Sequence, residues 1–263
     1  MDVQIKGVGK TYPDGTEVLR QVDLNIHSGE GVVLLGANGC GKSTLLRCML
    51  GLETITTGSI LLGGSSVAQL KGRSLRQLRS QIGSVFQQFN LVGNLSVFQN
   101  VLFGRLGNDG LIKSLNLTCR AENRDRAMHC LDRVGLAHLA SKRTDSLSGG
   151  QQQRVAIARM LMQDVKIVFA DEPVASLDPK AGREVMDLLF EIVHERKLTV
   201  VCVLHQIELA NEYAQRLVGL KDGKVVLDAT PDCVALDEIE ALYDRELNHC
   251  TDSVLKGEVN YAS

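Results

Sequence analysis

The sequence contains no tryptophan, and aromatic residues make up only 4% of its 263 residues. It also has no apolar run near the roughly 20 residues that a helix needs to cross a bilayer. The formal net charge is −2, so no excess of basic residues favours nucleic acid or an anionic membrane. We therefore expect no nucleic-acid partner, and we expect any role at a membrane to come through a partner protein.

A secretory signal and a cysteine framework are missing as well. The first residues, MDVQIKGVGK, contain no apolar segment of the kind that signal peptides carry. The seven cysteines are odd in number and form no C-x-x-C pair, which argues against disulfides and a zinc site. The content of 44% hydrophobic and 23% charged residues is typical of a globular protein, which we expect in the cytosol.

A glycine-rich segment, GANGCGKS at Gly36–Ser43, is the most informative part of the sequence. It matches the phosphate-binding P-loop, in which glycines let successive N–H groups point at a phosphate chain. Lys42 adds a positive charge for the β- and γ-phosphates, and the Ser43 hydroxyl is suited to ligate Mg²⁺. The residues that we expect around the nucleotide are Gly36, Ala37, Asn38, Gly39, Cys40, Gly41, Lys42, Ser43 and Thr44.

The residues on either side supply the structural context that this motif requires. Residues 32–35 are an apolar run typical of a buried strand, and residues 42–50 carry apolar side chains at helical spacing. A helix that begins at the loop would direct its positive end at the phosphates. The sequence therefore predicts a nucleoside triphosphate site. Two interpretations of Cys40 stay open. It is either only a small residue that the loop tolerates or, because its thiol lies beside Lys42 at this helix start, a reactive thiol with a depressed pKa.

Three further apolar runs, at 82–86, 167–170 and 198–204, each end at polar residues. These polar residues are Gln87, Asp171, Glu172 and His205. The carboxyl ends of parallel strands line the ligand crevice of an α/β sheet, so we expect these side chains near the phosphates. Asp171 and Gln87 can hold Mg²⁺. Glu172 can polarise an attacking water, and His205 can reach the γ-phosphate. We expect catalytic roles for Glu172, His205, Gln87 and Lys42.

A second glycine-rich helix start is found at Ser148, Gly149, Gly150 and Gln151, before a helical pattern at 152–162. Ser148 is suited to cap the helix, and the two glycines permit close approach of the backbone to an anion. One P-loop needs only one phosphate-binding helix start. We therefore expect the second one to bind a nucleotide that another copy of the chain holds.

The apolar pattern predicts an α/β chain that a helical subdomain interrupts. Within that subdomain we expect residues 104–120 to form a surface loop, because they are rich in Gly, Asn and Asp. The predicted divisions are 1–95, the first part of the core with the P-loop; 96–162, the helical subdomain; 163–247, the second part of the core; and 248–263, a tail. The fold class is that of a P-loop NTPase core, a mixed sheet flanked by helices with an antiparallel β part at its N-terminus.

Taken together, the motifs resemble those of ABC-type ATPases. The resemblance covers Met1 to about Leu247 and is carried by GANGCGKST at 36–44, LSGGQQQR at 147–154, VFADEP at 168–173, ASLD at 175–178, Gln87 and His205. It implies that Gln87 links the nucleotide to a transmembrane partner and that Ser148–Gln151 binds the ATP of an opposing subunit. It also implies that Tyr12 stacks on adenine, whereas the residues alone favour packing of Tyr12 at a strand end. Ser176–Asp178 would lie at the dimer contact.

A narrower resemblance is to the ATP-binding subunits of phosphonate importers. It is carried by QQFNLVGNLSVFQNVLFGRLG at 87–107, DEPVASLDP at 171–179 and LHQIELA at 204–210. The chain departs from that family at 107–120, where members usually have a tryptophan. Phosphite, hypophosphite or phosphate esters therefore stay open as transported substrates.

The resulting interpretation is a homodimeric ATPase that uses ATP and Mg²⁺ on the cytoplasmic face of the inner membrane. It would drive membrane permease subunits that an external substrate-binding protein supplies. We expect the permease contact within residues 87–115. The apolar residues there are Phe89, Leu91, Leu95, Phe98 and Leu102, and some of them must belong to the helical core. The alternative is a soluble accessory ATPase of a phosphonate-processing enzyme complex. DNA-repair or translation ABC proteins would need a long coiled-coil insert or tandem cassettes, and a P-loop kinase would leave LSGGQ unexplained.

Overall fold

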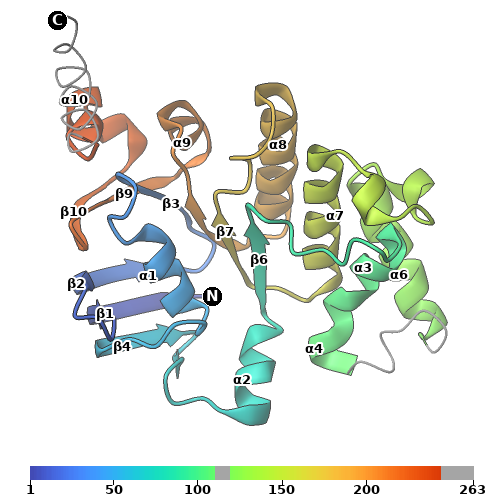
Figure 1. Ribbon diagram of the computed structural model, residues 1–263, viewed down its shortest axis with the longest axis horizontal. Helices are drawn as coiled ribbons and strands as arrows, with labels where there is room; N and C mark the ends of the chain where they lie inside the picture. The colour runs from blue at the N-terminus through green and yellow to red at the C-terminus, as the bar shows by residue number, and fades with distance from the viewer. Residues whose placement is uncertain (110–118, 244–263) are drawn as a thin grey trace, which may run out of the picture.

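A computed structural model describes residues 1–109 and 119–243 of the chain, and Figure 1 shows their arrangement. The strands form two sheets, one antiparallel and one mixed. The antiparallel sheet has the order β2-β1-β4-β5 and consists of β1 (Val3–Thr11), β2 (Glu17–Ile26), β4 (Thr57–Leu62) and β5 (Ser65–Ser66). The mixed sheet has the order β10-β9-β3-β8-β7-β6 and consists of β3 (Gly31–Leu35), β6 (Ile82–Phe86), β7 (Ile167–Asp171), β8 (Thr199–Val203), β9 (Arg216–Lys221) and β10 (Lys224–Ala229). The predicted mixed sheet and antiparallel N-terminal part are confirmed.

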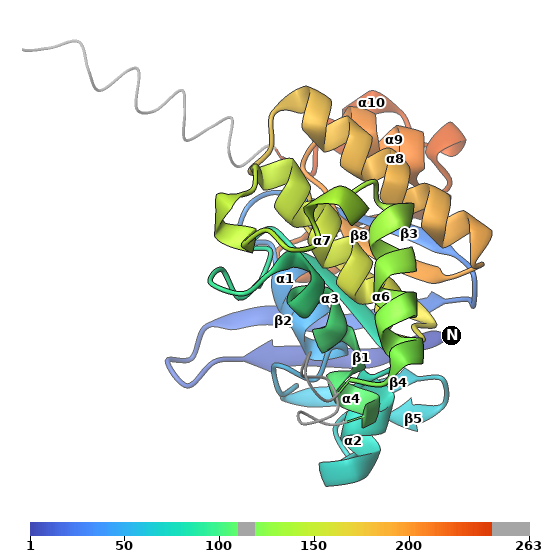
Figure 2. The same cartoon turned by 90° about the vertical axis from the view of Figure 1, so that its right-hand side faces the viewer.

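The helices cover both faces of the mixed sheet (Figures 1 and 2). They are α1 (Lys42–Met49), α2 (Gly72–Arg79), α3 (Val97–Leu102), α4 (Leu106–Asp109), α6 (Ala121–Arg133), α7 (Gly149–Met162), α8 (Pro179–Glu195), α9 (Ile207–Tyr213) and α10 (Leu236–Glu240). Short 3-10 turns occur at Phe103–Arg105, Ala137–Leu139, Thr144–Ser146 and Pro231–Cys233. The sequence pattern did not predict α9. The expected terminal helix at 236–247 ends at Glu240 within the described residues, and residues 244–247 and the tail lie outside them.

The mixed sheet is buried on both faces, which explains its unbroken apolar strands. In β8, Val200 and Cys202 pack into one core, and Val201 and Val203 pack into the other. The second core fills the space between the mixed sheet, α1 and the antiparallel sheet. The alternating side chains of each central strand therefore hold the two halves of the molecule together.

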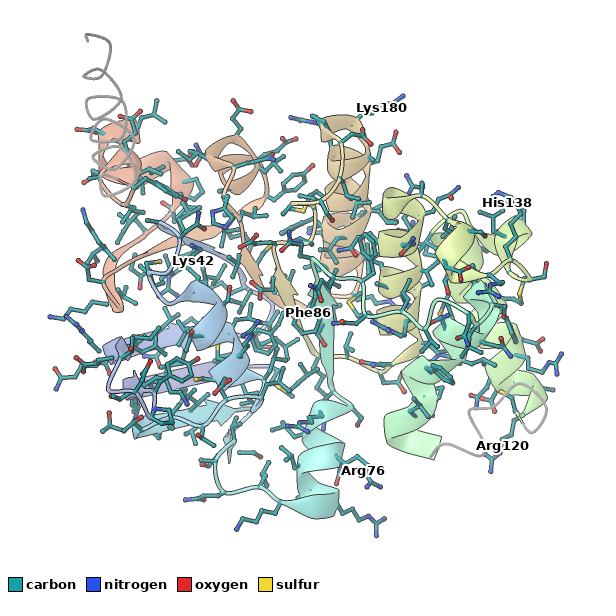
Figure 3. All side chains as sticks on the ribbon, viewed as in Figure 1. Lys42, Arg76, Phe86, Arg120, His138 and Lys180 are labelled. Atoms are coloured by element: carbon teal, nitrogen blue, oxygen red, sulfur yellow. The ribbon has the colours of Figure 1, made fainter. Side chains whose placement is uncertain are left out.

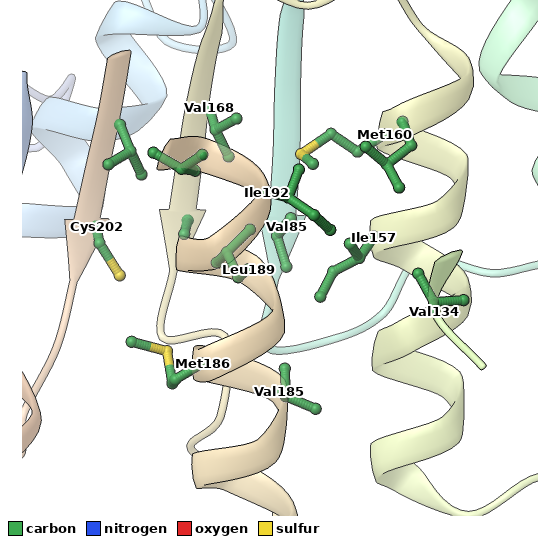
Figure 4. Packing of buried hydrophobic residues seen from close by; sticks show 14 of the residues in the cluster. Val85, Val134, Ile157, Met160, Val168, Val185, Met186, Leu189, Ile192 and Cys202 are labelled. Carbon is green, nitrogen blue, oxygen red and sulfur yellow. The ribbon is translucent and has the colours of Figure 1, made fainter. Parts of the chain in front are cut away.

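The first core lies between the mixed sheet and helices α7 and α8. Figure 4 shows Val85 and Val168 of two neighbouring strands near Leu189 and Ile192 of α8. The sequence pattern of α8 predicts an apolar stripe of Val185, Leu188, Leu189, Ile192 and Val193. Four of these five residues are buried, whereas Leu188 is only partly buried and Met186 is buried in addition. Helices α3, α6 and α7 pack against one another, as Figure 2 shows, and α3 and α6 extend the same core.

The surface loop predicted at 104–120 is wrong for its first part. Residues 103–105 form a 3-10 turn, and α4 continues it to Asp109. Gly104 allows this turn to pack on α7, because a Cβ there would lie 2.4 Å from the Arg159 carbonyl oxygen. The glycine thus serves close helix packing rather than a loop. Residues 110–118 lie outside the described part of the chain.

Candidate ATP-hydrolysis site

The P-loop connects the end of β3 to the start of α1. Gly36, Gly39 and Gly41 all have positive φ, at +140°, +76° and +111°. A Cβ on Gly36 would lie 2.2 Å from the carbonyl oxygen of Leu220, and one on Gly41 would lie 2.9 Å from Leu19. Both the backbone conformation and the packing therefore require glycine at 36 and 41. The prediction of a strand, a glycine loop and a helix is confirmed.

Lys42 lies under this loop, where Figure 3 labels it. Its ammonium donates hydrogen bonds to the carbonyl oxygens of Gly36, at 2.7 Å, and of Ala37, at 3.0 Å. Only 5% of the residue is exposed. The charge is thus held against the loop that we expect to surround the phosphates, and carbonyl oxygens satisfy its hydrogen bonds.

The prediction of a depressed pKa for the Cys40 thiol is wrong. Burial raises the pKa of its thiol, and the nearby charge of Lys42 only partly opposes this shift. The sulfur lies 3.9 Å from the Lys42 Nζ, and the residue is buried. A thiol that is covered and protonated at neutral pH is a poor nucleophile. The sequence showed the neighbouring charge but not the burial that outweighs it.

A cavity of about 440 Å³ brings together four of the predicted site residues, Ser43, Gln87, Asp171 and Glu172. They come from α1 and from the ends of β6 and β7, which are neighbours in the mixed sheet. Arg47 also lines the cavity, because it lies one turn after Ser43 on α1. The prediction missed Arg47, although its spacing of four residues from Ser43 could have indicated it.

The oxygen atoms in this cavity are of the kind that Mg²⁺ binds. The Ser43 hydroxyl donates to Asp171 Oδ1 at 3.1 Å, and the Gln87 N–H donates to the Asp171 carbonyl oxygen at 3.0 Å. Burial raises the pKa of the Asp171 carboxyl, and the Ser43 hydrogen bond opposes that shift. A hydroxyl, a carboxylate and a side-chain amide around one cavity fit a hard cation with oxygen ligands.

Glu172 and His205 form a close pair beside the cavity. His205 Nε2 lies 2.7 Å from Glu172 Oε1. Glu172 has a φ of +48°, an uncommon conformation for a residue with a side chain, and its N–H donates to the Val203 carbonyl oxygen at 3.2 Å. The sheet order β3-β8-β7-β6 places the P-loop, His205, the two carboxylates and Gln87 after four adjacent strands. These residues therefore lie together at the carboxyl ends of the parallel strands, as the sequence predicts.

Tyr12 lies in the turn between β1 and β2, away from the lining of this cavity. The ammonium of Lys10 lies 4.8 Å from the centre of the Tyr12 ring, which places a cation on one ring face. The β1–β2 hairpin itself reaches the P-loop, because Val18 and Leu19 contact the position of Gly41. Stacking of Tyr12 on adenine stays a prediction.

Ser148 caps α7 as predicted. Its hydroxyl accepts a hydrogen bond from the Gln151 N–H at 3.4 Å, and Gln151 Oε1 accepts one from the Ser148 N–H at 3.1 Å. A Cβ on Gly149 would lie 3.0 Å from Leu177, and one on Gly150 would lie 3.3 Å from the Ala181 Cβ. Packing within the chain thus accounts for both glycines. None of Ser148–Gln151 lines the cavity that contains Ser43.

A second hollow lies between the segment after β6 and the helical subdomain. Gln87, Phe89, Leu91, Asp145 and Ser176 are among its lining residues. Phe89 and Leu91 thus line a hollow at the surface, and their contact with a permease stays a prediction. Leu102 is fully buried and belongs to the core instead, and Phe98 packs partly against that core.

Three features together define an ATP-binding cassette. They are the P-loop after β3, an inner strand of the mixed sheet, the carboxylates at the end of β7, and the SGGQ segment at the start of α7. The ABC transporter family matches residues 19–175, and the chain belongs to that family. No helix within residues 1–109 and 119–243 is long and apolar enough to cross a membrane.

Two curated relatives span most of the chain. The chain is 52% identical over 240 residues to the phosphate-import ATP-binding protein PhnC of Mycolicibacterium smegmatis, covering 91% of each chain. It is 53% identical over 230 residues to the phosphonates import ATP-binding protein PhnC of Nocardia farcinica, covering 88% of this chain and 86% of the relative. The narrower resemblance to phosphonate import ATP-binding subunits is confirmed.

Solved structures of ABC cassettes have the same fold. CbiO1 of Clostridium perfringens, part of the ABC transporter complex CbiONQ, superposes with a TM-score of 0.77 at 34% identity and 88% coverage of each chain. The dimeric post-hydrolysis cassette MJ0796, bound to ADP and Pi, gives a TM-score of 0.75 at 38% identity, covering 87% of this chain and 98% of its own.

Proposed function

We propose that two copies of this chain hydrolyse ATP to drive the import of phosphonates or related phosphorus oxyanions through a membrane permease. The observation that carries the proposal is the cavity in which Ser43, Gln87, Asp171 and Glu172 meet, in a chain related to PhnC proteins. One relative is named for phosphate and the other for phosphonates, which supports a phosphorus oxyanion as the class of substrate.

In this proposal the P-loop holds the phosphates and Tyr12 stacks on the base. Lys42 exchanges its bonds to Gly36 and Ala37 for bonds to the β- and γ-phosphates. Ser43, Gln87 and Asp171 would hold Mg²⁺. When bound, the cation neutralises charge on the phosphates. The backbone N–H groups at the start of α1 add their partial positive charges.

Glu172 is the proposed general base. Its carboxylate takes a proton from the attacking water, while His205, at 2.7 Å, fixes the orientation of the carboxylate and reaches the γ-phosphate. The left-handed backbone at Glu172 holds the side chain between the cavity and His205. The chain's own reaction is ATP + H₂O → ADP + phosphate.

The site is completed by a second copy in this proposal. Ser148–Gln151 binds the nucleotide held by the opposing P-loop, and Ser176–Asp178 lies at the contact between the copies. The exposed Ser148 at the start of α7 and the dimeric neighbour support this arrangement. We keep 1–95, 96–162 and 163–247 as the proposed divisions of each copy, with 248–263 as a tail.

The permease is proposed to contact the hollow beside Phe89 and Leu91, and the chain is proposed to sit on the cytoplasmic face of the membrane. An external binding protein delivers the substrate. Because the hollow shares Gln87 with the nucleotide cavity, the two sites are joined by one short segment. Movement at one site therefore reaches the other.

Reconstitution tests this function. The full chain, its co-purified permease and the binding protein are placed in liposomes, and uptake of a phosphonate, of phosphite and of phosphate is measured with MgATP inside. We expect ATP-dependent uptake of at least one of these anions, and a Phe89→Glu variant that hydrolyses ATP without transport. Co-purification with a soluble phosphonate-processing complex and no permease would instead support the accessory ATPase.

A further inference from the structure

Gln153 is a polar side chain that the nucleotide site does not use, although it is completely buried. It lies on α7, five residues after Ser148. Its Nε2 donates to the Pro173 carbonyl oxygen at 2.5 Å and to the Phe86 carbonyl oxygen at 3.4 Å. Pro173 directly follows Glu172, and Phe86 directly precedes Gln87 (Figure 3 labels Phe86). One amide therefore joins the two segments that carry the hydrolytic residues.

The orientation of the Gln153 amide is determined by its neighbours. Two carbonyl oxygens can only accept hydrogen bonds, so the NH₂ group must face them and Oε1 must face away. Oε1 is buried and has no hydrogen-bond partner among the described residues. A buried acceptor without a partner destabilises the folded state. An apolar side chain of similar length would remove that cost, but it would leave the Pro173 and Phe86 carbonyl oxygens without this donor. The glutamine is therefore kept for the connection that it makes between the two segments.

Arg159 makes a second connection from the same helix. Its guanidinium donates to the Asn90 carbonyl oxygen at 2.5 Å and to the Phe89 carbonyl oxygen at 3.2 Å. Burial lowers the pKa of this side chain, and no carboxylate pairs with it among the described residues. The segment that Arg159 holds includes Asn90 at a φ of +52°, a conformation that needs support from its surroundings.

The two side chains bracket Gln87. Gln153 holds the carbonyl before it, and Arg159 holds the carbonyls of the second and third residues after it. On the other side, the Gln87 N–H is bonded to the Asp171 carbonyl oxygen. A shift or tilt of α7 must therefore move the backbone around Gln87 and, through Pro173, the backbone next to Glu172.

We propose that Gln153 and Arg159 are positioning residues that couple the place of helix α7 to the placement of Gln87 and Glu172 in the same chain. Engagement of Ser148 by the nucleotide of a second copy would move α7, and these hydrogen bonds would align the residues for hydrolysis. The inference rests on the proposed function, because it requires the two-copy nucleotide site.

A double-mutant cycle on the full chain tests this coupling. Gln153→Met and Ser148→Ala should each lower kcat about tenfold with KM within about twofold. The double variant should be no more than about twofold slower than the slower single variant, because both changes interrupt the same connection. A double variant slower by about a hundredfold, the product of the two effects, would overturn the coupling. A Ser148→Ala variant with wild-type kcat would count against the two-copy site itself.

Gln163→Met is the matched control. Gln163 caps the other end of α7, and its Oε1 is likewise buried without a partner in the described part of the chain. We expect its kcat to stay within about twofold of wild type. An equal loss in Gln153→Met and Gln163→Met would mean general damage to the helix and would overturn the proposal.

Arg159 is tested by two replacements. Arg159→Lys keeps a donor for the Phe89 and Asn90 carbonyls and should retain kcat within about threefold, whereas Arg159→Met should lose about tenfold. A fluorescent nucleotide measures the ATP affinity of the single chain. We expect this affinity to match wild type in every variant, which would show that each variant folds. If Gln153→Met does not fold, Gln153→Leu takes its place. A wild-type kcat in Arg159→Met would exclude Arg159 as a positioning residue.

Discussion

The two glycine-rich helix starts of this chain look alike in sequence but use their glycines differently. In the P-loop, all three glycines have positive φ, from +76° to +140°, and α1 has no side-chain cap. At the second start, Ser148 caps α7, and Gly149 and Gly150 lie within the helix and pack against Leu177 and Ala181. One set of glycines shapes a loop, and the other allows two segments to touch.

The two helix starts also differ in what surrounds them within one chain. The P-loop is surrounded by Lys42, Ser43 and the carboxylates of β7 within the same chain. The start of α7 has Ser148 exposed, and none of its residues lines the nucleotide cavity. Four predictions test this contrast and the proposal that the start of α7 binds the nucleotide of a second copy.

The largest effect is expected for Glu172→Gln. The amide keeps the size of the side chain but cannot take a proton from water, so turnover should fall ~10²–10⁴-fold, about 3–5 kcal/mol of barrier. Nucleotide binding at the P-loop should persist, and ATP-bound dimers should accumulate, because neither helix start is altered. Turnover assays measure the rate of hydrolysis, and size-exclusion chromatography with MgATP measures the accumulation of dimers. Turnover close to wild type would exclude Glu172 as the base.

Ser148→Arg separates the two helix starts directly. A bulky cation at the exposed start of α7 should block the second copy, so turnover should fall about a hundredfold, or about 3 kcal/mol of barrier. ATP affinity of the single chain should stay within about twofold, because the P-loop is intact. Loss of the cap itself should lower stability by only ~1 kcal/mol. Failure of the single chain to bind ATP would show that the two starts are not independent.

Replacing glycine by alanine should distinguish conformation from packing. Gly36→Ala places a Cβ 2.2 Å from a backbone oxygen at a φ of +140°, and should lower the free energy of unfolding by about 3 kcal/mol. Gly150→Ala needs only a small shift at Ala181 and gains helix propensity, so its change should be under ~1 kcal/mol.

Gly39→Ala is the control for this comparison. Nothing lies within 4 Å of its Cβ, so only the cost of positive φ applies, about 1 kcal/mol. Urea unfolding of the full chain measures all three variants. Equal losses for Gly36→Ala and Gly150→Ala would contradict the distinction between the two helix starts.

The smallest effect is expected at Cys40. Because burial raises the pKa of its thiol, the thiolate fraction near pH 7 is low and grows only as the pH rises toward that raised pKa. A maleimide should modify the exposed Cys233 at least about tenfold faster than Cys40. Cys40→Ala should keep turnover within about twofold. Rapid labelling of Cys40 that MgATP prevents would mean that the loop opens in solution.

Features that depend on neighbouring residues in the chain could be predicted from the sequence. The P-loop and the cap at Ser148 depend on residues that are adjacent in the chain, and both are found where the patterns place them. The strand ends that carry Gln87, Asp171 and His205 were also predictable, because buried parallel strands are short apolar runs. These features determined the class of protein and its reaction.

Tertiary contacts decided the rest. The sheet order made neighbours of strands that are far apart in the chain and placed His205 2.7 Å from Glu172. Burial turned Cys40 from an expected nucleophile into a covered thiol, and helix packing turned Gly104 from a loop residue into a contact point. The connections of Gln153 and Arg159 to carbonyls beside Gln87 have no local signature. Burial and backbone contacts arise between distant segments, and a sequence pattern contains only the chemistry of near neighbours.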